Sequence, residues 1–308
     1  MRIALLKPLL SLIFWVTTTT STSTPARVLI YTATKGFRHD SIPTAVQALK
    51  NQSQSLNIVF DATEDAGQFT DQNLAVYDAI VFISTTGEVL DDGGKGVHAS
   101  SDCLNTSTFY GNETGAYFDY HPFLQNASVD VLEASHPSVN MLPAQWHIQE
   151  EMYNFKSDPR SVGAVVVLAA NESSYIDTGV RRFDQGSPHP SAWYQERGAG
   201  VQSGHSAGRS FYTSLGHLNE TWKDSLFIAH VTGGLLWTLF SNTTKAFNSS
   251  ALVGNPQATS TSSTKSIPSA SATQSPVGNG HSSSVRLAPS LALPLLLFGV
   301  VIAALSSH

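Results

Sequence analysis

Short apolar runs alternate with segments of helical spacing along the first part of the chain. Residues 27–31 form an apolar, β-branched run, and residues 41–50 follow with apolar positions at helical spacing. Residues 57–61 and 79–83 repeat the apolar run. Continuous apolar strands separated by helical segments are typical of a parallel sheet that is covered on both faces. The pattern therefore predicts an α/β domain.

The second half of the domain follows the same pattern less regularly. Residues 161–169 predict one more buried strand. Residues 191–194 and 209–214 alternate more between apolar and polar positions, and we expect them to pair with that strand. In residues 225–239 the apolar positions recur at helical spacing, which predicts a last helix that closes the domain.

Both ends of the chain carry apolar segments outside this domain. Residues 1–24 join a basic start to an apolar stretch too short to span a bilayer, which predicts a secretory signal peptide. Residues 287–308 are mostly apolar and lack the basic residues that usually follow a membrane-spanning helix on its cytoplasmic side. Rows of small residues precede them, which is the layout of a glycosylphosphatidylinositol attachment signal. Residues 242–284 are rich in Ser, Thr, Pro and Gly and predict a stalk without a core.

These segments predict where the protein resides. We expect a domain over residues 27–240 that is secreted and held at the cell surface through a lipid anchor in the membrane. The alternative is a plain C-terminal transmembrane helix. A glycosylphosphatidylinositol signal restricts the source to a eukaryote, and the Ser/Thr-rich stalk favours a walled, fungal organism.

Composition narrows the classes of partner and fold. The single cysteine, Cys103, excludes a disulfide framework, so stability must come from a packed core. The formal net charge is −6 and no basic stripe is present, which argues against nucleic acid as a partner. Asn-x-Ser/Thr acceptors recur along the chain and predict a glycosylated surface. They are Asn51, Asn105, Asn112, Asn126, Asn171, Asn219, Asn242 and Asn248.

Six short motifs mark the expected loops of the domain. In open sheets of this class, ligands bind beyond the carboxyl ends of the strands, so we expect the chemistry after Tyr31, Ile83, Val97 and Ser214. The motifs are residues 36–42 (GFRHDSI), 96–102 (GVHASSD), 115–122 (GAYFDYHP), 150–155 (EEMYNF), 189–193 (HPSAW) and 208–217 (GRSFYTSLGH).

This succession of motifs resembles the ThuA-like (trehalose utilisation) family over residues 27–239. The resemblance implies a flavodoxin-like fold, with a doubly wound and mostly parallel sheet, related to the class I glutamine amidotransferases. It also implies a role in sugar utilisation. In those amidotransferases a cysteine nucleophile occupies a strand-to-helix elbow, and here His98 takes that place, which argues against amidotransferase chemistry.

One departure from the family concerns the middle of the sheet. Only residues 86–95 separate the strand at residues 79–83 from the Gly-Val-His motif, whereas the family has a helix and most of another strand there. Parallel strands need a connection of a dozen or more residues. We therefore expect that one helix/strand crossover near residues 91–95 is deleted.

The motif histidines and carboxylates allow two kinds of site. His39, His98 and His121 are candidate ligands of a divalent metal such as zinc, since neutral imidazoles suit such ions. The metal-free alternative makes His98 or His217 a general base, with Asp102 or Glu151 as its orienting group or as an acid. The expected catalytic residues are His98, Asp102, Glu151 and His217.

Together, the terminal segments and the family resemblance imply a cell-surface protein that acts on, or binds, a small carbohydrate or a cell-wall glycan. One interpretation is a sugar hydrolase or a related enzyme. Two alternatives stay open, namely a non-catalytic glycan-binding module and an inactive, truncated isoform. Trp146, Tyr153, Tyr117 and Trp193 offer either a stacking surface for a sugar ring or ordinary core packing.

Overall fold

The computed structural model describes residues 24–87, 89–90, 114–198, 208–240 and the backbone of 300–304. The helices are α1 (Ile42–Asn51), α2 (Ser53–Leu56), α3 (Asp71–Leu74) and α5 (Ser225–Leu239), with 3₁₀ turns η1 (Ala66–Gln68), η2 (Pro159–Val162), η3 (Glu172–Ser174) and η4 (Thr221–Lys223). The strands are β1 (Ala26–Tyr31), β2 (Ile58–Thr63), β3 (Ala79–Ile83), β4 (Phe118–Tyr120), β5 (Gln125–Val131), β6 (Gln145–Glu150), β7 (Asn154–Phe155), β8 (Val165–Ala170), β9 (Pro190–Gln195), β10 (Ser210–Thr213) and β11 (Val300–Ala304).

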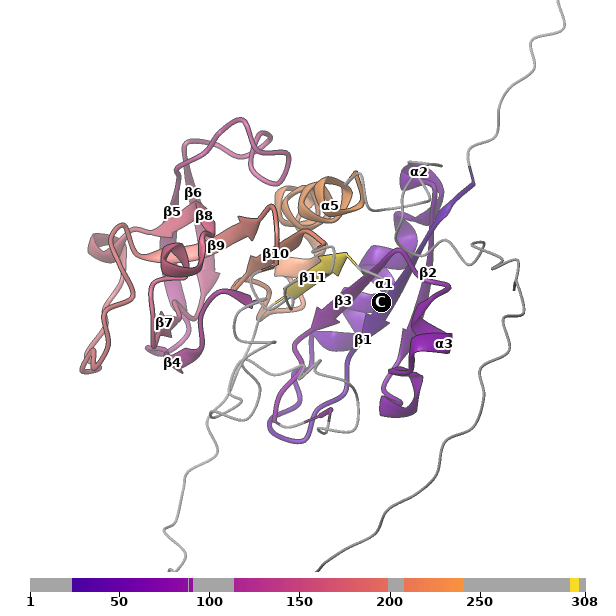
Figure 1. The fold of residues 1–308 in the computed structure, drawn as a ribbon. Coiled ribbons are helices and arrows are strands. Elements are labelled where there is room, and N and C mark those ends of the chain that lie inside the picture. The colour runs from indigo at the N-terminus through magenta and orange to yellow at the C-terminus, as the bar shows by residue number, and fades with distance from the viewer. Residues whose placement is uncertain (1–23, 88, 91–113, 199–207, 241–299, 305–308) are drawn as a thin grey trace, which may run out of the picture.

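A mixed sheet runs through the whole domain (Figure 1). Within the described ranges it has nine strands in the order β2-β1-β3-β11-β10-β9-β8-β5-β6, and β4 pairs with β7 in a separate two-stranded sheet. The chain therefore has an α/β fold, as its sequence predicts.

The first part of the sheet is parallel. Strand β1 pairs in parallel with β2 on one side and with β3 on the other. All five residues of β3 are buried, as expected for an uninterrupted apolar run inside a covered sheet. The strands expected over residues 27–31, 57–61 and 79–83 and the helix expected over residues 41–50 are confirmed.

The rest of the sheet is antiparallel, and here the doubly wound, mostly parallel prediction is wrong. Strands β5, β6, β8, β9 and β10 each pair with their neighbours in antiparallel fashion, and in Figure 1 this half curls away from the parallel part. Antiparallel neighbours need no crossover helix between them. The predicted pairing of residues 161–169 with 191–194 is confirmed, whereas residues 209–214 pair with β9 instead.

The two faces of the sheet are covered differently, which also separates this fold from a flavodoxin. Helices α1 and α5 pack over one face, where Leu49, Phe227 and Leu235 join a single apolar core. The opposite face is covered by Phe69 and by the strands β4 and β7, which contribute Phe118 and Phe155. The predicted last helix over residues 225–239 is confirmed as α5.

Helix α5 contains a glycine, Gly233, that allows a close approach to the loop before β6. A Cβ atom at Gly233 would overlap the carbonyl oxygen of Pro137 and come within 2.9 Å of Ser138 Cα. We expect Gly233→Ala to lower the free energy of unfolding by about 2 kcal/mol, because backbone overlap outweighs the ~1 kcal/mol gain in helix propensity. Urea denaturation measures this change. Gly67→Ala, whose Cβ meets only the Asp65 side chain, is the control and should change stability little.

Several expectations fall outside the described residues. They are residues 1–23 of the signal peptide expected over 1–24, the expected deletion near 91–95, the stalk at 242–284 and all of the C-terminal tail except residues 300–304. Across the described ranges, no helix combines the length and apolarity that a bilayer crossing requires.

Candidate functional site

Loops from four different strands bring three histidines and two glutamates together. His39 lies between β1 and α1, His121 directly follows β4, and His217 lies in the loop after β10. Glu150 ends β6 and Glu151 follows it. Two of these loops, after Tyr31 and after Ser214, are those in which the sequence places the chemistry.

Glu151 lies at the centre of this cluster. Its Oε2 atom is 3.2 Å from Nδ1 of His217 and 3.5 Å from Nε2 of His121. The other ring nitrogen of His121, Nδ1, is 2.8 Å from the carbonyl oxygen of Pro122, which only an N–H can satisfy. The side chain of Glu151 is only 11% exposed and faces both imidazoles.

Glu150 points to the backbone of the His217 loop. Its Oε1 atom accepts hydrogen bonds from the amides of Gly216 (2.7 Å) and His217 (3.1 Å) and from the Thr221 hydroxyl (3.4 Å). The side chain is fully buried, and burial raises its pKa to about 7 although the two amides act in the opposite direction. Gly216 has φ +119°, a conformation that favours glycine, and its carbonyl oxygen accepts a bond from Trp222 Nε1.

His39 and His217 have opposite protonation tendencies, although their ring centroids are 5.5 Å apart. Burial, together with the neighbouring His217 and His121, lowers the pKa of His39 to about 2. For His217, burial lowers the pKa, but Glu151 and Glu150 outweigh it and the net pKa is raised. His39 is therefore neutral at ordinary pH, whereas His217 carries a proton more readily than a free histidine.

Comparison with known proteins identifies the family. The profile of the ThuA family, described as trehalose utilisation, matches residues 27–238. The chain belongs to the ThuA family. No curated protein matches it.

Two solved structures of ThuA-like proteins are similar to this one. The first, from Bacteroides uniformis, has a TM-score of 0.56 and 18% identity, covering 74% of this chain and 96% of that one. The second, from Parabacteroides merdae, has a TM-score of 0.48 and 14% identity, covering 70% and 90%. At this identity the first likeness shows the fold alone.

Four of the six residues that the ThuA-like motifs single out lie in the cluster. His39, His121, Glu151 and His217 meet there, whereas His98 and Asp102 lie outside the described residues. Among described residues, no group of three or more His, Cys, Asp or Glu side chains is arranged to hold a metal ion. The zinc set of His39, His98 and His121 stays a prediction.

The candidate stacking residues belong mostly to the core of this ThuA domain. Trp146, Tyr153 and Trp193 are all 5% exposed or less, so they offer no open platform for a sugar. Tyr153 nevertheless supports the cluster, because its ring stacks on His121 at 5.5 Å between centroids with 20° between planes.

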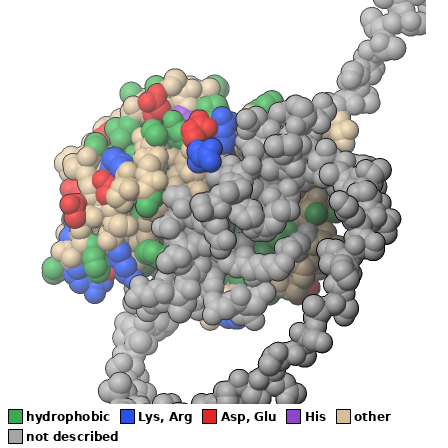
Figure 2. All heavy atoms as spheres, in the orientation of Figure 1, with side chains coloured by type: hydrophobic (Ala, Val, Ile, Leu, Met, Phe, Trp, Pro, Cys, Tyr) green, Lys and Arg blue, Asp and Glu red, His purple; other side chains and the backbone are tan. Residues whose placement is uncertain are grey.

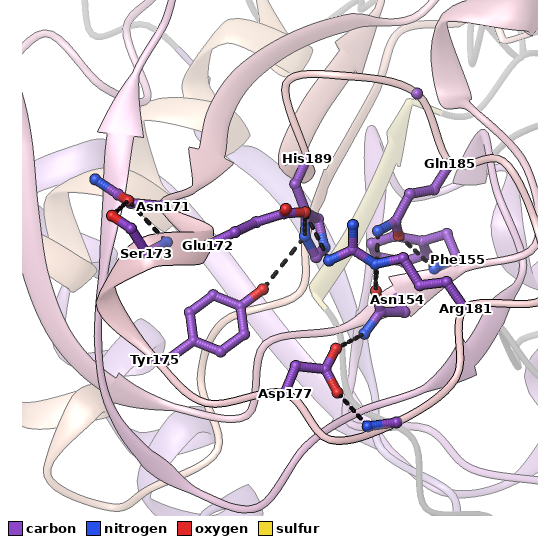
Figure 3. A network of polar contacts seen from close by, with 12 residues as sticks. Asn154, Phe155, Asn171, Glu172, Ser173, Tyr175, Asp177, Arg181, Gln185 and His189 are labelled. Atoms are coloured by element: carbon purple, nitrogen blue, oxygen red, sulfur yellow. Dashed lines mark hydrogen bonds and ion pairs between the residues drawn. The ribbon is translucent and has the colours of Figure 1, made fainter.

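Sequence reasoning missed a polar network beside the cluster, which Figure 3 shows. His189 Nε2 donates to the Tyr153 carbonyl oxygen at 2.7 Å, and its Nδ1 lies 3.0 Å from Glu172 Oε1. Arg181 joins Glu172 to Asn154, with distances of 2.6 Å and 2.9 Å. This network ties the loop between β8 and β9 to the backbone that carries Tyr153. The His189-Pro190 dipeptide does not indicate this network, since such dipeptides also occur in ordinary turns.

Two surface hollows lie apart from the cluster. One of about 560 Å³ is lined by Thr44, Gln47 and Lys223 among others, and one of about 650 Å³ lies over β5 and β6 beside His147. Neither brings a histidine and a carboxylate together, so the chemistry favours the Glu151 cluster. Figure 2 shows side chains of both charges interspersed on the described face, with no continuous basic patch there.

Proposed function

We propose that the cluster of His39, His121, Glu151 and His217 is an acid–base site that acts on a carbohydrate. The observation that carries this proposal is the contact of Glu151 Oε2 with Nδ1 of His217, at 3.2 Å. A carboxylate on one imidazole nitrogen fixes the ring and stabilises its charged form, which leaves Nε2 to exchange protons with a substrate. Membership of a family linked to trehalose utilisation supports a sugar as that substrate.

His217 is the residue that moves the proton. Glu151 and Glu150 raise its pKa despite burial, so it can take a proton from a sugar hydroxyl or water and return it near neutral pH. Glu151 orients it and balances the charge that forms. We infer a hydrolase or isomerase-like reaction, in which one hydroxyl proton passes through Nε2.

His121 would bind the sugar rather than move its protons. His39 is only 3% exposed and its low pKa keeps its ring neutral, so it would support the site from inside the protein without adding charge. The Nδ1 atom of His121 is held by the Pro122 carbonyl, which fixes the direction of the ring. An imidazole that is held in one orientation can form a well-aligned hydrogen bond with a sugar hydroxyl.

The test is a screen of disaccharides, starting with trehalose, followed by NMR of the anomeric protons. We expect the protein to convert one of these disaccharides, and we expect His217→Gln to slow that conversion by about 10²–10⁴-fold. His147→Gln is the matched control, because His147 is exposed on β6 and away from the cluster. Equal rates for both variants would overturn the assignment of His217.

The same screen addresses the binding-module alternative. A sugar that binds by saturation-transfer NMR but is recovered unchanged would favour recognition without catalysis. Conversion that stops on adding a chelator would favour the metal site of His39, His98 and His121 instead.

A further inference from the structure

Strand β11 occupies a central place in the sheet although it comes from the far end of the chain. Figure 1 shows it in yellow between β3 and β10. Its five residues pair antiparallel with β3, from Val300 opposite Ile83 to Ala304 opposite Ala79. Four of them also pair antiparallel with β10. Both edges of β11 are therefore hydrogen-bonded inside the sheet.

The space between β3 and β10 has the width of one strand. Neighbouring strands lie ~4.8 Å apart, so β3 and β10, with one strand between them, are ~10 Å apart and cannot bond each other directly. All residues of β3 and β10 are buried. This burial applies with β11 in place. Without a strand in this space, the facing N–H and C=O groups of β3 and β10 would lose these partners in the middle of the sheet, which native proteins avoid.

The sequence of residues 300–304 suits this space. It reads Val-Val-Ile-Ala-Ala, without a charge or a polar side chain, as is typical of strands covered on both faces. The register places Ile302 between Val81 and Phe211, both buried in the core below α5. It places Val301 between Phe82 and Tyr212, which belong to the core on the opposite face.

We propose that the slot between β3 and β10 is a strand-acceptor site and that its occupant is residues 300–304 of the same molecule. The C-terminal segment is then a permanent part of the folded domain. It stands where the family's crossover strand is expected, next to β3. The chain thus completes its own sheet by β-strand addition, in the antiparallel direction.

This proposal competes with the lipid-anchor interpretation for the same residues. Attachment of glycosylphosphatidylinositol near residues 278–284 would release residues 300–304 together with the tail. A mature chain cannot both lose this segment and keep it as β11. Our proposal therefore requires that the folded protein retains its C-terminus.

An engineered cross-link tests the pairing directly. In the full chain with Cys103→Ser, the pair Val81→Cys and Ile302→Cys is in register, and cross-strand partners are near enough for a disulfide. The control pair, Val81→Cys and Val301→Cys, is one residue out of register and faces opposite sides of the sheet. We expect an intramolecular disulfide in the first pair only, detected by mass spectrometry after non-reducing digestion. Absence of the bond, or a bond between two molecules, would overturn the proposal.

Shortening the chain tests the energetic consequence. A protein ending at residue 299 is expected to aggregate or to melt more than about 10 °C lower than the full chain. Ile302→Pro, which removes a ladder donor and blocks pairing, should act in the same direction, whereas Ser307→Pro is the control outside the strand. Unchanged melting of the shortened protein, or a secreted and folded protein whose mass lacks residues 300–304, would contradict the proposal.

Discussion

Replacing Glu150 by alanine is expected to lower the free energy of unfolding by about 4 kcal/mol. The carboxylate of Glu150 accepts hydrogen bonds from the amides of Gly216 and His217 and from Thr221, all through Oε1. Alanine would leave these donors in a buried place without their acceptor, at ~1–3 kcal/mol for each buried group, and would add a cavity. Urea denaturation at pH 7 measures the loss.

Glu150→Gln separates the hydrogen bonds from the charge. Its amide oxygen can take the position of Oε1 and accept the same three bonds, so we expect a loss within ~1 kcal/mol. Because the Gly216 amide fixes the loop that carries His217, the alanine variant should also lose carbohydrate conversion, whereas the glutamine variant keeps it. Equal destabilisation by the two substitutions would show that the carboxylate charge, not the acceptor, holds the loop.

The elements that could be predicted are those whose local pattern is unambiguous. Residues 79–83 are apolar throughout and residues 225–239 repeat with helical spacing, and both appear within the expected bounds as β3 and α5. Burial of a whole strand requires an uninterrupted apolar run, and packing of a helix requires apolar residues at helical spacing. Both patterns can be recognised in the sequence. Such elements need no knowledge of their partners.

The antiparallel half gave a weaker signal because its strands are partly solvent-exposed. Strand β6 reads Gln-Trp-His-Ile-Gln-Glu, and only Trp146 and Glu150 are buried in it. Its identity as a strand depends on pairing with β5, which is a non-local interaction. Strand β11 shows the converse difficulty, since an apolar run suits a buried strand as well as a membrane signal, and its pairing with β3 is a non-local interaction that the run itself does not reveal.

For the site, sequence motifs indicated which loops matter but not which side chains meet. Glu150 and Glu151 are adjacent in the sequence, yet their carboxylates contact the backbone and the side chain of His217 separately. The geometry of the network around His189 depends on a loop folding back onto Asn154, which no local pattern encodes.

Two histidines are buried in the core of the protein. We therefore expect the free energy of unfolding to fall in acid at a higher pH than that at which ordinary carboxylates are protonated. Burial lowers the pKa of His136 and of His230 to about 4, with Arg209 adding to the effect on His136. His136 stacks on Tyr194, and His230 Nδ1 donates to the Ser138 carbonyl oxygen. Both rings are therefore neutral in the folded protein at pH 7.

The sign of the pH effect follows from which state binds the proton first. As pH falls from 6.5 to 4, the unfolded chain protonates these rings while the folded chain does not, which removes ~3 kcal/mol of stability per histidine. Glu150 acts oppositely between pH 7 and 4.5, because its raised pKa gives the folded state the proton first, which restores ~3 kcal/mol. The net loss by pH 4 is about 3 kcal/mol from these three groups, and His39 adds to it in the same direction as the other histidines.

Unfolding free energies measured in urea between pH 8 and pH 4 check this balance. We expect His230→Asn, which keeps a donor for the Ser138 carbonyl but does not titrate, to flatten the decline below pH 6.5. Glu150→Gln should steepen it, because the opposing group is gone. His147→Asn, on the exposed face of β6, should leave the profile unchanged. A decline of the same slope in the His230→Asn and unsubstituted proteins would mean that His230 is protonated in the folded state, and the acid sensitivity would then belong to other groups.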